Sequence, residues 1–301
     1  MRAGRAHYDL AMRLRLVALV ALPLLTTAVA CGSSDSDPSS GSAPTTASTK
    51  AVSCAVSDLP LKTAGKLTIG TDSPAYDPWF SDNDPANGKG FESAVAYAVA
   101  DKLGFDQADV VWAKVPFNNS YAPGPKKFDF DINQISITPE RAKVVDFSDG
   151  YYSAAQAVIV LDKDKVAASS LADLKALKLG AQTGTTSLTA VRDQIKPSSD
   201  PAVFKDTNAA KQALLNGQVD AIVADLPTAF YITAAEIEGS SILGQFQPAT
   251  GQQEQFGLLL EKGSALTGCV DKAIEALTSD GTLAGLEKQW LSETVDVPVL
   301  K

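Results

Sequence analysis

The chain has 301 residues, of which 26 are Lys or Arg and 35 are Asp or Glu, so its formal net charge is −9. This acidic balance argues against binding to nucleic acid. The only histidine, His7, lies in an N-terminal stretch that we expect to be removed. Without His7, the remaining chain has no histidine, which excludes Ser-His-Asp catalysis, Cys-His catalysis and histidine metal sites.

Residues 1–30 are predicted to be a lipoprotein signal peptide. An arginine-rich start precedes an apolar run of 15 residues, Leu16 to Ala30, which is too short for a bilayer because a spanning helix takes about 20 residues. The stretch AVAC at residues 28–31 resembles a bacterial lipobox, in which the cysteine, here Cys31, is freed by cleavage and diacylated, for example with palmitate. The alternative is an ordinary signal peptide that is cut after Ala30.

Residues 31–61 are predicted to be the lipid anchor and a flexible tether. The tract Gly32 to Lys50 is rich in Ser, Thr, Asp, Gly and Pro and cannot bury a core. We therefore expect an exported protein that is attached by lipid to the outer face of the cell membrane, at the cell surface or in the periplasm.

Cys54 and Cys269 are the only cysteines besides Cys31. An exported chain folds where disulfides persist, so we expect these two cysteines to be bridged. By chain entropy alone, closing a loop of about 215 residues would stabilise the fold by about 5 kcal/mol at most. The alternative is a pair of free buried thiols.

Predicted strands and helices alternate along most of the remaining chain, which indicates an α/β fold of two lobes. The irregular segment 72–90 is long enough to suggest a function. The predicted strands are residues 66–71, 110–115, 130–137, 155–161, 179–182, 203–204, 220–224 and 255–260. The predicted helices are residues 91–103, a helix beginning after Thr138, 171–177, 187–195, 209–216, 228–236, 270–277 and 283–290.

Arg141 falls in the first turn of a predicted helix, because Thr138 is a good N-cap and Pro139 suits the first helical position. The helix dipole disfavours a cation there by about 0.3 to 1 kcal/mol. Something negative should lie beside it. Either Glu140 or another surface carboxylate fills this role, or a bound anion does, since a helix N-terminus with a guanidinium is a receptor for anions.

Three further groups lie just past predicted strands, where open α/β sheets bind ligands. Asp72 with Tyr76 and the aromatic residues after it suits a cationic or amide group, or else forms a turn and core. The stretch QTGTTS at 182–187 offers N–H groups and hydroxyls to an anion, or else is a plain helix cap. Asp225 is either a ligand-binding acid or, more simply, an N-cap. Together with Arg141, these three groups predict a ligand that has one negative and one positive charge. A free amino acid carries both.

The chain from about residue 66 to 291 resembles the bacterial extracellular solute-binding proteins of family 3, the polar amino-acid binding components of ABC importers. The resemblance rests on SITPERAKVVDFSDGYY, LADLKALKLGAQTGTTS, LLNGQVDAIVADLPTAFYI and SDGTLAGLEKQWL, which occur in the order of the family. It implies a two-lobed, type II periplasmic-binding-protein-like α/β fold with two crossover hinge strands. The implied lobes are 62–157 with 253–301, and 158–252.

The resemblance also implies roles for individual residues. Arg141 would hold the α-carboxylate of the ligand, helped by Ser136 and Thr185, and Asp225 would take the α-ammonium with a carbonyl near Gln134. Asp72 would face the ligand side chain between two aromatic walls. The implied ligand-binding residues are Asp72, Tyr76, Phe117, Gln134, Ser136, Arg141, Thr185, Thr186 and Asp225.

The function implied is that of a monomeric binding protein, without cofactor, metal or catalysis, that delivers an amino acid to a membrane permease. Two alternatives share this fold, a ligand-binding sensor component and an enzyme like the cyclohexadienyl dehydratases. Lacking histidine, such an enzyme would need carboxylates as acid and base.

Two stretches depart from the family pattern. The sequence FNNSYAPGPKKF at 117–128 is too rich in proline for the usual leucine-rich helix, so Asn118, Asn119 and Tyr121 are expected to line the pocket differently. Asp131 and Asn133 occupy a strand where small or apolar residues are usual. These departures leave the identity of the ligand open.

Overall fold

The computed structural model describes residues 53–247, 253–291 and 297–301. The predicted signal peptide, Cys31 and the tether as far as residue 52 lie outside the described residues. No helix within the described ranges is long and apolar enough to cross a membrane.

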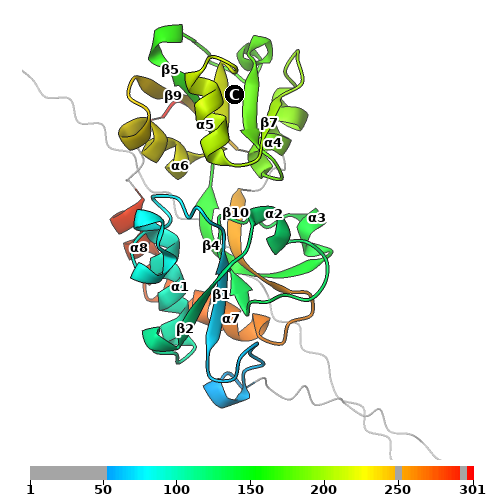
Figure 1. Cartoon of the computed structure of the whole chain (residues 1–301), viewed down its shortest axis with the longest axis vertical. Helices are drawn as coiled ribbons and strands as arrows, with labels where there is room; N and C mark the ends of the chain where they lie inside the picture. The colour runs from blue at the N-terminus through cyan, green and yellow to red at the C-terminus, as the bar shows by residue number, and fades with distance from the viewer. Residues whose placement is uncertain (1–52, 248–252, 292–296) are drawn as a thin grey trace, which may run out of the picture. The chain divides into compact units, whose positions relative to one another are not determined.

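The first sheet has the strand order β2-β1-β3-β10-β4. Strand β1 pairs in parallel with β2 and β3, whereas β10 runs antiparallel to β3 and β4. Helices α1, α7 and α8 pack against one another beside this sheet (Figure 1). The bounds are β1 Leu67–Thr71, β2 Val110–Lys114, β3 Phe130–Asp131, β4 Val145–Ala154, β10 Glu254–Glu261, α1 Phe91–Lys102, α7 Thr267–Ser279 and α8 Thr282–Trp290.

The second sheet has the strand order β7-β6-β8-β5-β9. Strand β6 is parallel to β7 and β8, and β5 is antiparallel to β8 and β9. Helices α4 and α6 each continue into one turn of π-helix. The bounds are β5 Gln156–Leu161, β6 Leu179–Gln182, β7 Ala202–Phe204, β8 Ala221–Asp225, β9 Ser240–Phe246, α4 Thr186–Ala190, α5 Thr207–Leu215 and α6 Leu226–Tyr231.

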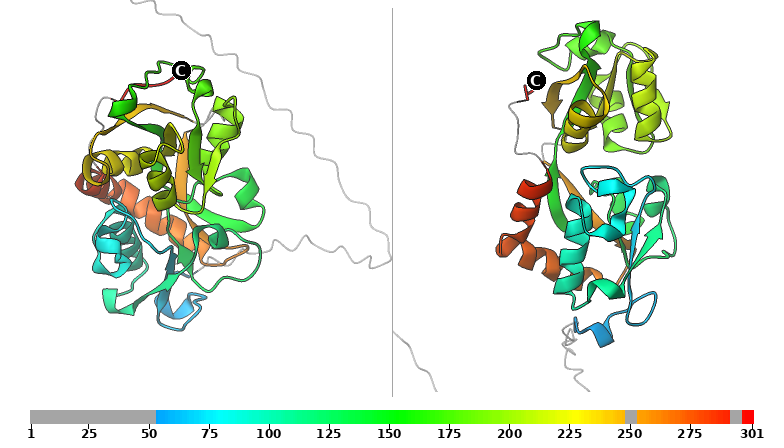
Figure 2. Two further views of the ribbon diagram at one scale, coloured as in Figure 1. Left: turned by 45° about the horizontal axis from the view of Figure 1, so that its top comes forward. Right: turned by 60° about the vertical axis from the view of Figure 1, so that its left-hand side comes forward.

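We call the first sheet with α1, α7, α8 and the short helices α2 (Phe117–Ser120) and α3 (Pro139–Ala142) the first lobe, and the second sheet with α4, α5 and α6 the second lobe. The chain changes sheet at Ala155, where β4 passes directly into β5 (Figure 2). This point precedes the expected boundary after residue 157. The return from β9 to β10 runs through residues 248–252, outside the described ranges.

The core of the first lobe is rich in aromatic side chains from the irregular segment 72–90. Trp79 and Phe80 are fully buried, and the Trp79 ring meets the edge of Phe91 at 6.0 Å between centroids. Burying a large apolar side chain contributes about 1.5 to 3 kcal/mol. For these two aromatic residues, core packing is therefore the correct interpretation.

Several predicted elements differ from those observed. Strand β3 ends at Asp131 instead of residue 137, and Gln134 interrupts the expected extended run because its φ is 48°. Strands β4 and β9 were not predicted, and residues 171–177 contain only the 3₁₀ turn Asp173–Ala176. Strand β4 includes the polar stretch SDG and is held by its long-range pairing with β10, which local propensity does not reveal.

The assignment of residues 253–301 to the first lobe is wrong at its C-terminal end. Residues 297–301 lie along β9, where the Gln245 N–H donates to the Pro298 carbonyl at 2.8 Å and the Leu300 N–H donates to the Gln245 carbonyl at 2.9 Å. Leu300 is buried in the core of the second lobe, and the C-terminus is marked there in Figure 1. These bonds satisfy backbone groups that the edge strand would otherwise expose.

A disulfide joins Cys54, before β1, to Cys269 in the first turn of α7. It ties the N-terminal end of the described chain to the core of the first lobe, where Cys269 is buried.

Candidate functional site

A pocket lies between the lobes at the carboxyl ends of β1, β6 and β8. Every predicted ligand-binding residue except Arg141 lines it, namely Asp72, Tyr76, Phe117, Gln134, Ser136, Thr185, Thr186 and Asp225. The lining residues that sequence reasoning missed include Asn133, which was noted only as a departure from the family, and Thr207 and Thr228. Within the described ranges, no group of side chains has the composition of a metal site.

Arg141 lies behind the pocket wall with 8% of its surface exposed. Thr138 caps α3 by accepting a hydrogen bond from the Arg141 N–H, as expected. The guanidinium donates from Nη1 to the Ser136 carbonyl at 2.8 Å and from Nη2 to the Gly184 carbonyl at 2.9 Å, and it stacks on the Tyr121 ring at 4.6 Å. Burial lowers the pKa of Arg141, and the charges of nearby acids oppose this shift.

The ion pairs found among the described residues do not include Arg141, and Glu140 is exposed. A surface carboxylate is therefore not the partner of Arg141 in this structure. Its guanidinium is instead bound by two backbone carbonyls, that of Ser136 in the first lobe and that of Gly184 in the second.

Asp225 ends β8 at the position before α6, yet its side chain makes no capping hydrogen bond. Its Oδ1 instead accepts a hydrogen bond of 3.0 Å from Gln156 Nε2. Burial, and then the charge of Glu254, raise the pKa of Asp225 well above its usual value. The simple N-cap interpretation is thus wrong for this side chain, which faces the pocket.

Gln134 is held in its left-handed conformation by Glu92 of α1. The Gln134 backbone N–H donates to Glu92 Oε1 at 2.6 Å, its side-chain amide donates to Glu92 Oε2, and Tyr151 donates its hydroxyl to the same carboxyl group. Burial raises the pKa of Glu92 to about 7. In the sequence, this role of Glu92 could have been recognised from its place directly after Phe91, on the buried face of a predicted helix.

The loop after β6 contributes hydroxyls that are already engaged. Thr185 caps α4 by accepting from the Leu188 N–H at 3.1 Å, and it donates its own proton to the Gln182 carbonyl at 2.8 Å. The plain cap interpretation therefore holds for the Thr185 side chain, although the residue also lines the pocket. Thr186 reaches across to the first lobe, where its Oγ1 lies 3.2 Å from Ser136 Oγ.

Asp72 acts in part as the predicted turn residue, because its Oδ1 accepts from the Ser73 N–H at 2.6 Å. Its Oδ2 accepts from the Phe117 N–H at 3.1 Å and so fixes one aromatic wall of the pocket. Tyr76 forms the other wall, and burial, followed by the charge of Asp206, raises its pKa to about 12.

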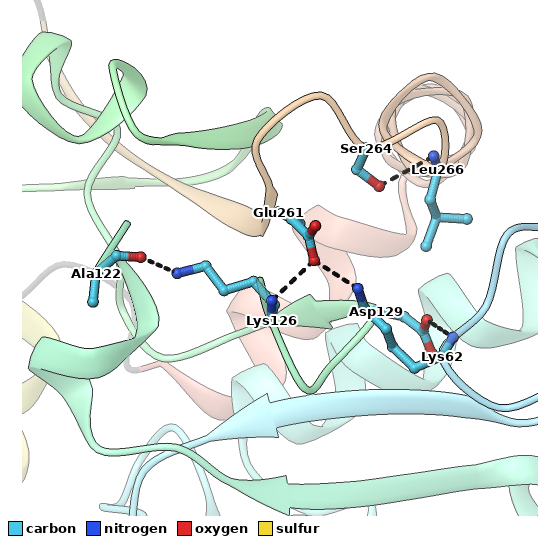
Figure 3. Close-up of polar contacts among 7 residues, drawn as sticks. All are labelled: Lys62, Ala122, Lys126, Asp129, Glu261, Ser264 and Leu266. Carbon is cyan, nitrogen blue, oxygen red and sulfur yellow. Dashed lines mark hydrogen bonds and ion pairs between the residues drawn. The ribbon is translucent and has the colours of Figure 1, made fainter. Parts of the chain in front are cut away.

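The segment 117–128 has only the single helical turn of α2. Asn118, Asn119 and Tyr121 do not line the pocket, contrary to expectation. Tyr121 instead donates its hydroxyl proton to Asn118 Oδ1 at 2.5 Å, and its hydroxyl oxygen lies 3.3 Å from the Gly184 carbonyl oxygen of the second lobe. The far end of the segment is anchored where the Lys126 N–H donates to Glu261 at 2.9 Å and its ammonium donates to the Ala122 carbonyl (Figure 3).

The two unusual polar residues near β3 differ in their surroundings. Asn133 lines the pocket, whereas Asp131 is fully buried and neither of its carboxyl oxygens has a hydrogen-bond partner in the described part of the chain. Burial, and then the charge of Glu92, raise the pKa of Asp131 well above its usual value. Asp131 is therefore a buried acid that does not line the pocket.

Direct contacts join the lobes around the pocket. Trp79 donates its indole N–H to Thr228 Oγ1 at 2.8 Å, and this bond connects the core of the first lobe to α6. With the contacts of Arg141 and Tyr121 to Gly184, it holds the two walls of the pocket together.

The sequence of this chain is similar to the sequences of known amino-acid-binding proteins. Residues 67–293 match the sequence model of the bacterial extracellular solute-binding proteins, family 3. The L-cystine-binding protein TcyJ of Escherichia coli (strain K12) is 28% identical over 78% of this chain and 86% of its own length. The ABC transporter glutamine-binding protein GlnH of Bacillus subtilis (strain 168) is 30% identical over 71% and 77%.

Solved structures of amino-acid-binding proteins have a similar fold. An ancestral arginine-binding protein bound to glutamine superposes with a TM-score of 0.64 at 33% identity, covering 77% of this chain and 100% of that chain. The arginine-, lysine-, histidine-binding protein ArtJ from Geobacillus stearothermophilus gives a TM-score of 0.65 at 27% identity, covering 77% and 97%. The two sheets thus form the type II periplasmic-binding-protein fold, and the chain belongs to the bacterial extracellular solute-binding proteins of family 3.

Proposed function

We propose that this protein captures a free polar amino acid between its two lobes and delivers it to the permease of an ABC importer. The observation that carries the proposal is that Asp225 and Ser136 line the same pocket and that Arg141 donates a hydrogen bond to the Ser136 carbonyl. An acidic residue on the pocket wall and a guanidinium directly behind that wall match the two charged groups of an amino acid. Membership of family 3 supports the same function.

In this proposal Asp225 receives the α-ammonium and Arg141 the α-carboxylate. A guanidinium has five N–H donors, and the carbonyls of Ser136 and Gly184 take two of those on Arg141. The remaining donors suffice for a carboxylate that approaches from the pocket. The Thr185 hydroxyl already donates its proton to the Gln182 carbonyl. Thr185 would therefore bind the ligand carboxylate through its backbone N–H alone.

The far end of the pocket favours a ligand side chain with an N–H group or a positive charge. Asp72 and Asp225 are the charged residues of the lining, and neither Lys nor Arg is among the lining residues. The names of related proteins include cystine, glutamine and arginine, so the polar amino acids are the class to examine.

We further infer a lipid anchor at Cys31, a monomeric state and a binding function without catalysis. The lobe limits that we propose are those predicted from the sequence, adjusted to a change of sheet at Ala155 and to the C-terminal residues on β9.

One structural neighbour is described as a precursor of cyclohexadienyl dehydratase. Incubation with prephenate and arogenate should give no turnover, and measurable turnover would contradict the binding-only role.

The proposal is tested by thermal shift against the twenty amino acids, ornithine and citrulline. A ligand at a hundredfold excess over its Kd stabilises the folded state by about 2.7 kcal/mol, which is a clear shift in Tm. Titration calorimetry then gives the affinity of each hit. Absence of a shift with every member of the panel would contradict amino-acid binding.

A further inference from the structure

Glu254 is a buried acid that the sequence analysis did not select and that does not line the pocket. It is the first residue of β10, directly after the return crossover, and 8% of its surface is exposed. Its Oε1 accepts a hydrogen bond of 2.6 Å from Ser136 Oγ, and its Oε2 accepts one of 2.8 Å from Gln156 Nε2. Both donors adjoin the proposed amino-acid site, so Glu254 acts on that site through them.

The hydrogen bond from Ser136 to Glu254 fixes the direction in which the Ser136 hydroxyl proton points. A serine hydroxyl has one proton, and here that proton points at Glu254. Ser136 Oγ is then left with lone pairs only, and Thr186 must be the donor in the 3.2 Å contact between the two hydroxyls. Toward the pocket, Ser136 can therefore accept a hydrogen bond from an N–H group, and its side chain cannot donate one to a carboxylate.

The bond from Gln156 fixes the orientation of a second group. Gln156 Nε2 donates to Glu254 and also to Asp225 Oδ1 at 3.0 Å, so one amide nitrogen bridges two carboxylates. Its carbonyl oxygen Oε1 is buried and has no hydrogen-bond partner among the described residues. The two carboxylates thus determine which way the amide faces, because a carboxylate is the stronger acceptor. Asp225 is held at the pocket as a result.

We propose that Glu254 is a positioning residue that makes this end of the pocket an acceptor site for the ligand ammonium. It does so by directing the Ser136 proton away from the pocket and by holding Gln156 against Asp225. This inference rests on the proposed function, because it concerns how the same site distinguishes an amino acid from its deaminated analogue. It also changes the role of the Ser136 side chain, which serves the ammonium end and not the carboxylate.

The first experiment needs no ligand. In the protein without added amino acid, the Tm losses of Ser136→Ala and Glu254→Ala should be non-additive in the double variant, because one removes the donor and the other the acceptor of the same hydrogen bond. Glu261→Ala is the matched control, since Glu261 lies at the opposite end of β10 and pairs with Lys62 at the surface. Its loss should add to that of Ser136→Ala. Additive losses for Ser136 and Glu254 would overturn the proposed hydrogen bond.

The second experiment measures recognition, with L-arginine against 5-guanidinopentanoate and L-glutamine against glutaramate as probes. Glu254→Gln should weaken binding of the amino acid at least about tenfold, equivalent to 1.4 kcal/mol, and change binding of the deaminated analogue less than about threefold. Glu254→Asp keeps a carboxylate and should recover part of the preference, which also covers the case in which the Gln variant folds poorly.

Each result decides a different point. Equal losses for the amino acid and its analogue would mean that Glu254 is merely structural, and wild-type selectivity in Glu254→Gln would overturn the inference. If the wild-type protein binds no member of the amino-acid panel, the proposed function fails, and the acceptor role of Glu254 fails with it. The ligand-free experiment would then still decide whether Ser136 donates to Glu254.

Discussion

Arg141 donates a hydrogen bond of 2.9 Å to the carbonyl oxygen of Gly184, and this bond joins the first lobe to the loop after β6 in the second. Gly184 has a φ of 76°. A Cβ at this position would lie 2.0 Å from Asn118 Oδ1 and 2.3 Å from the Tyr121 hydroxyl oxygen. The contact between the lobes therefore requires glycine here, both for its backbone conformation and for the space that a side chain would need.

Substitution of Gly184 should weaken ligand binding more than it weakens the fold. Gly184→Ala strains a positive φ, by about 1 to 2 kcal/mol, and also drives a methyl group into Asn118 and Tyr121. Gly217→Ala is the matched control, because Gly217 has a φ of 68° and open space around it. Both should lower the Tm, and calorimetry should show a loss of affinity only for Gly184→Ala. Equal affinities of the two variants would contradict a role of this contact in closure.

Arg141→Ala should weaken amino-acid binding by at least about a hundredfold, equivalent to 2.7 kcal/mol. The reason is that the ligand carboxylate would be left without its charged partner. Arg141→Lys should recover only part of the affinity, because an ammonium cannot match a carboxylate bidentately. Titration calorimetry of the three proteins checks this, and an affinity of Arg141→Ala within threefold of wild type would exclude the assigned role.

Asp225→Asn should reduce affinity strongly and leave the Tm of the ligand-free protein unchanged or higher. The side chain makes no capping bond that the substitution could remove, and burial already disfavours its charge. The ligand ammonium, in contrast, loses a charged acceptor. Wild-type affinity in the Asn variant would show that Asp225 does not bind the ligand.

The stability of the ligand-free protein should fall as the pH rises from about 4.5 to about 7. Burial raises the pKa of Glu92 to about 7 in the folded state, so the folded protein holds a proton that the unfolded chain has lost. This contribution is fully present below pH 4.5 and is lost as the pH approaches 7, with a magnitude of about 3 kcal/mol at most.

Urea denaturation at several pH values, compared between wild type and Glu92→Gln, measures the contribution of Glu92. Asp131 and Asp225 also have raised pKa values and act in the same direction, so the difference between the two proteins is the quantity of interest. The variant should show a clearly smaller decline between pH 4.5 and 7. Parallel curves would argue against a protonated Glu92.

Cys31→Ala should release the protein from membranes, because the acylated cysteine would be its only lipid-bearing residue. Detergent partitioning of wild type and variant, expressed with the full leader, provides the measurement. Cys31 lies outside the described residues, so the prediction rests on the sequence AVAC at 28–31. Equal partitioning of the two proteins would refute lipidation at this residue.

Local sequence determined the features that depend on neighbours along the chain. Thr138 and Pro139 fixed the start of α3, and the apolar spacing after Phe91 fixed α1, because capping and helical periodicity act within a few residues. The ends of β1, β6 and β8 were also predictable, and the shared edge of parallel strands placed Asp72, Thr185 and Asp225 near one another.

The tertiary structure alone decided which partner each polar group has. Strands β4 and β9 exist through pairing with residues far along the chain, and Asp225 turns from its helix to Gln156 because the neighbouring strand offers a donor. Ser136 and Glu254, 118 residues apart, meet only because the chain returns from the second lobe at β10. A hydrogen bond of this kind depends on the positions of two distant segments, and no pattern within either segment encodes it.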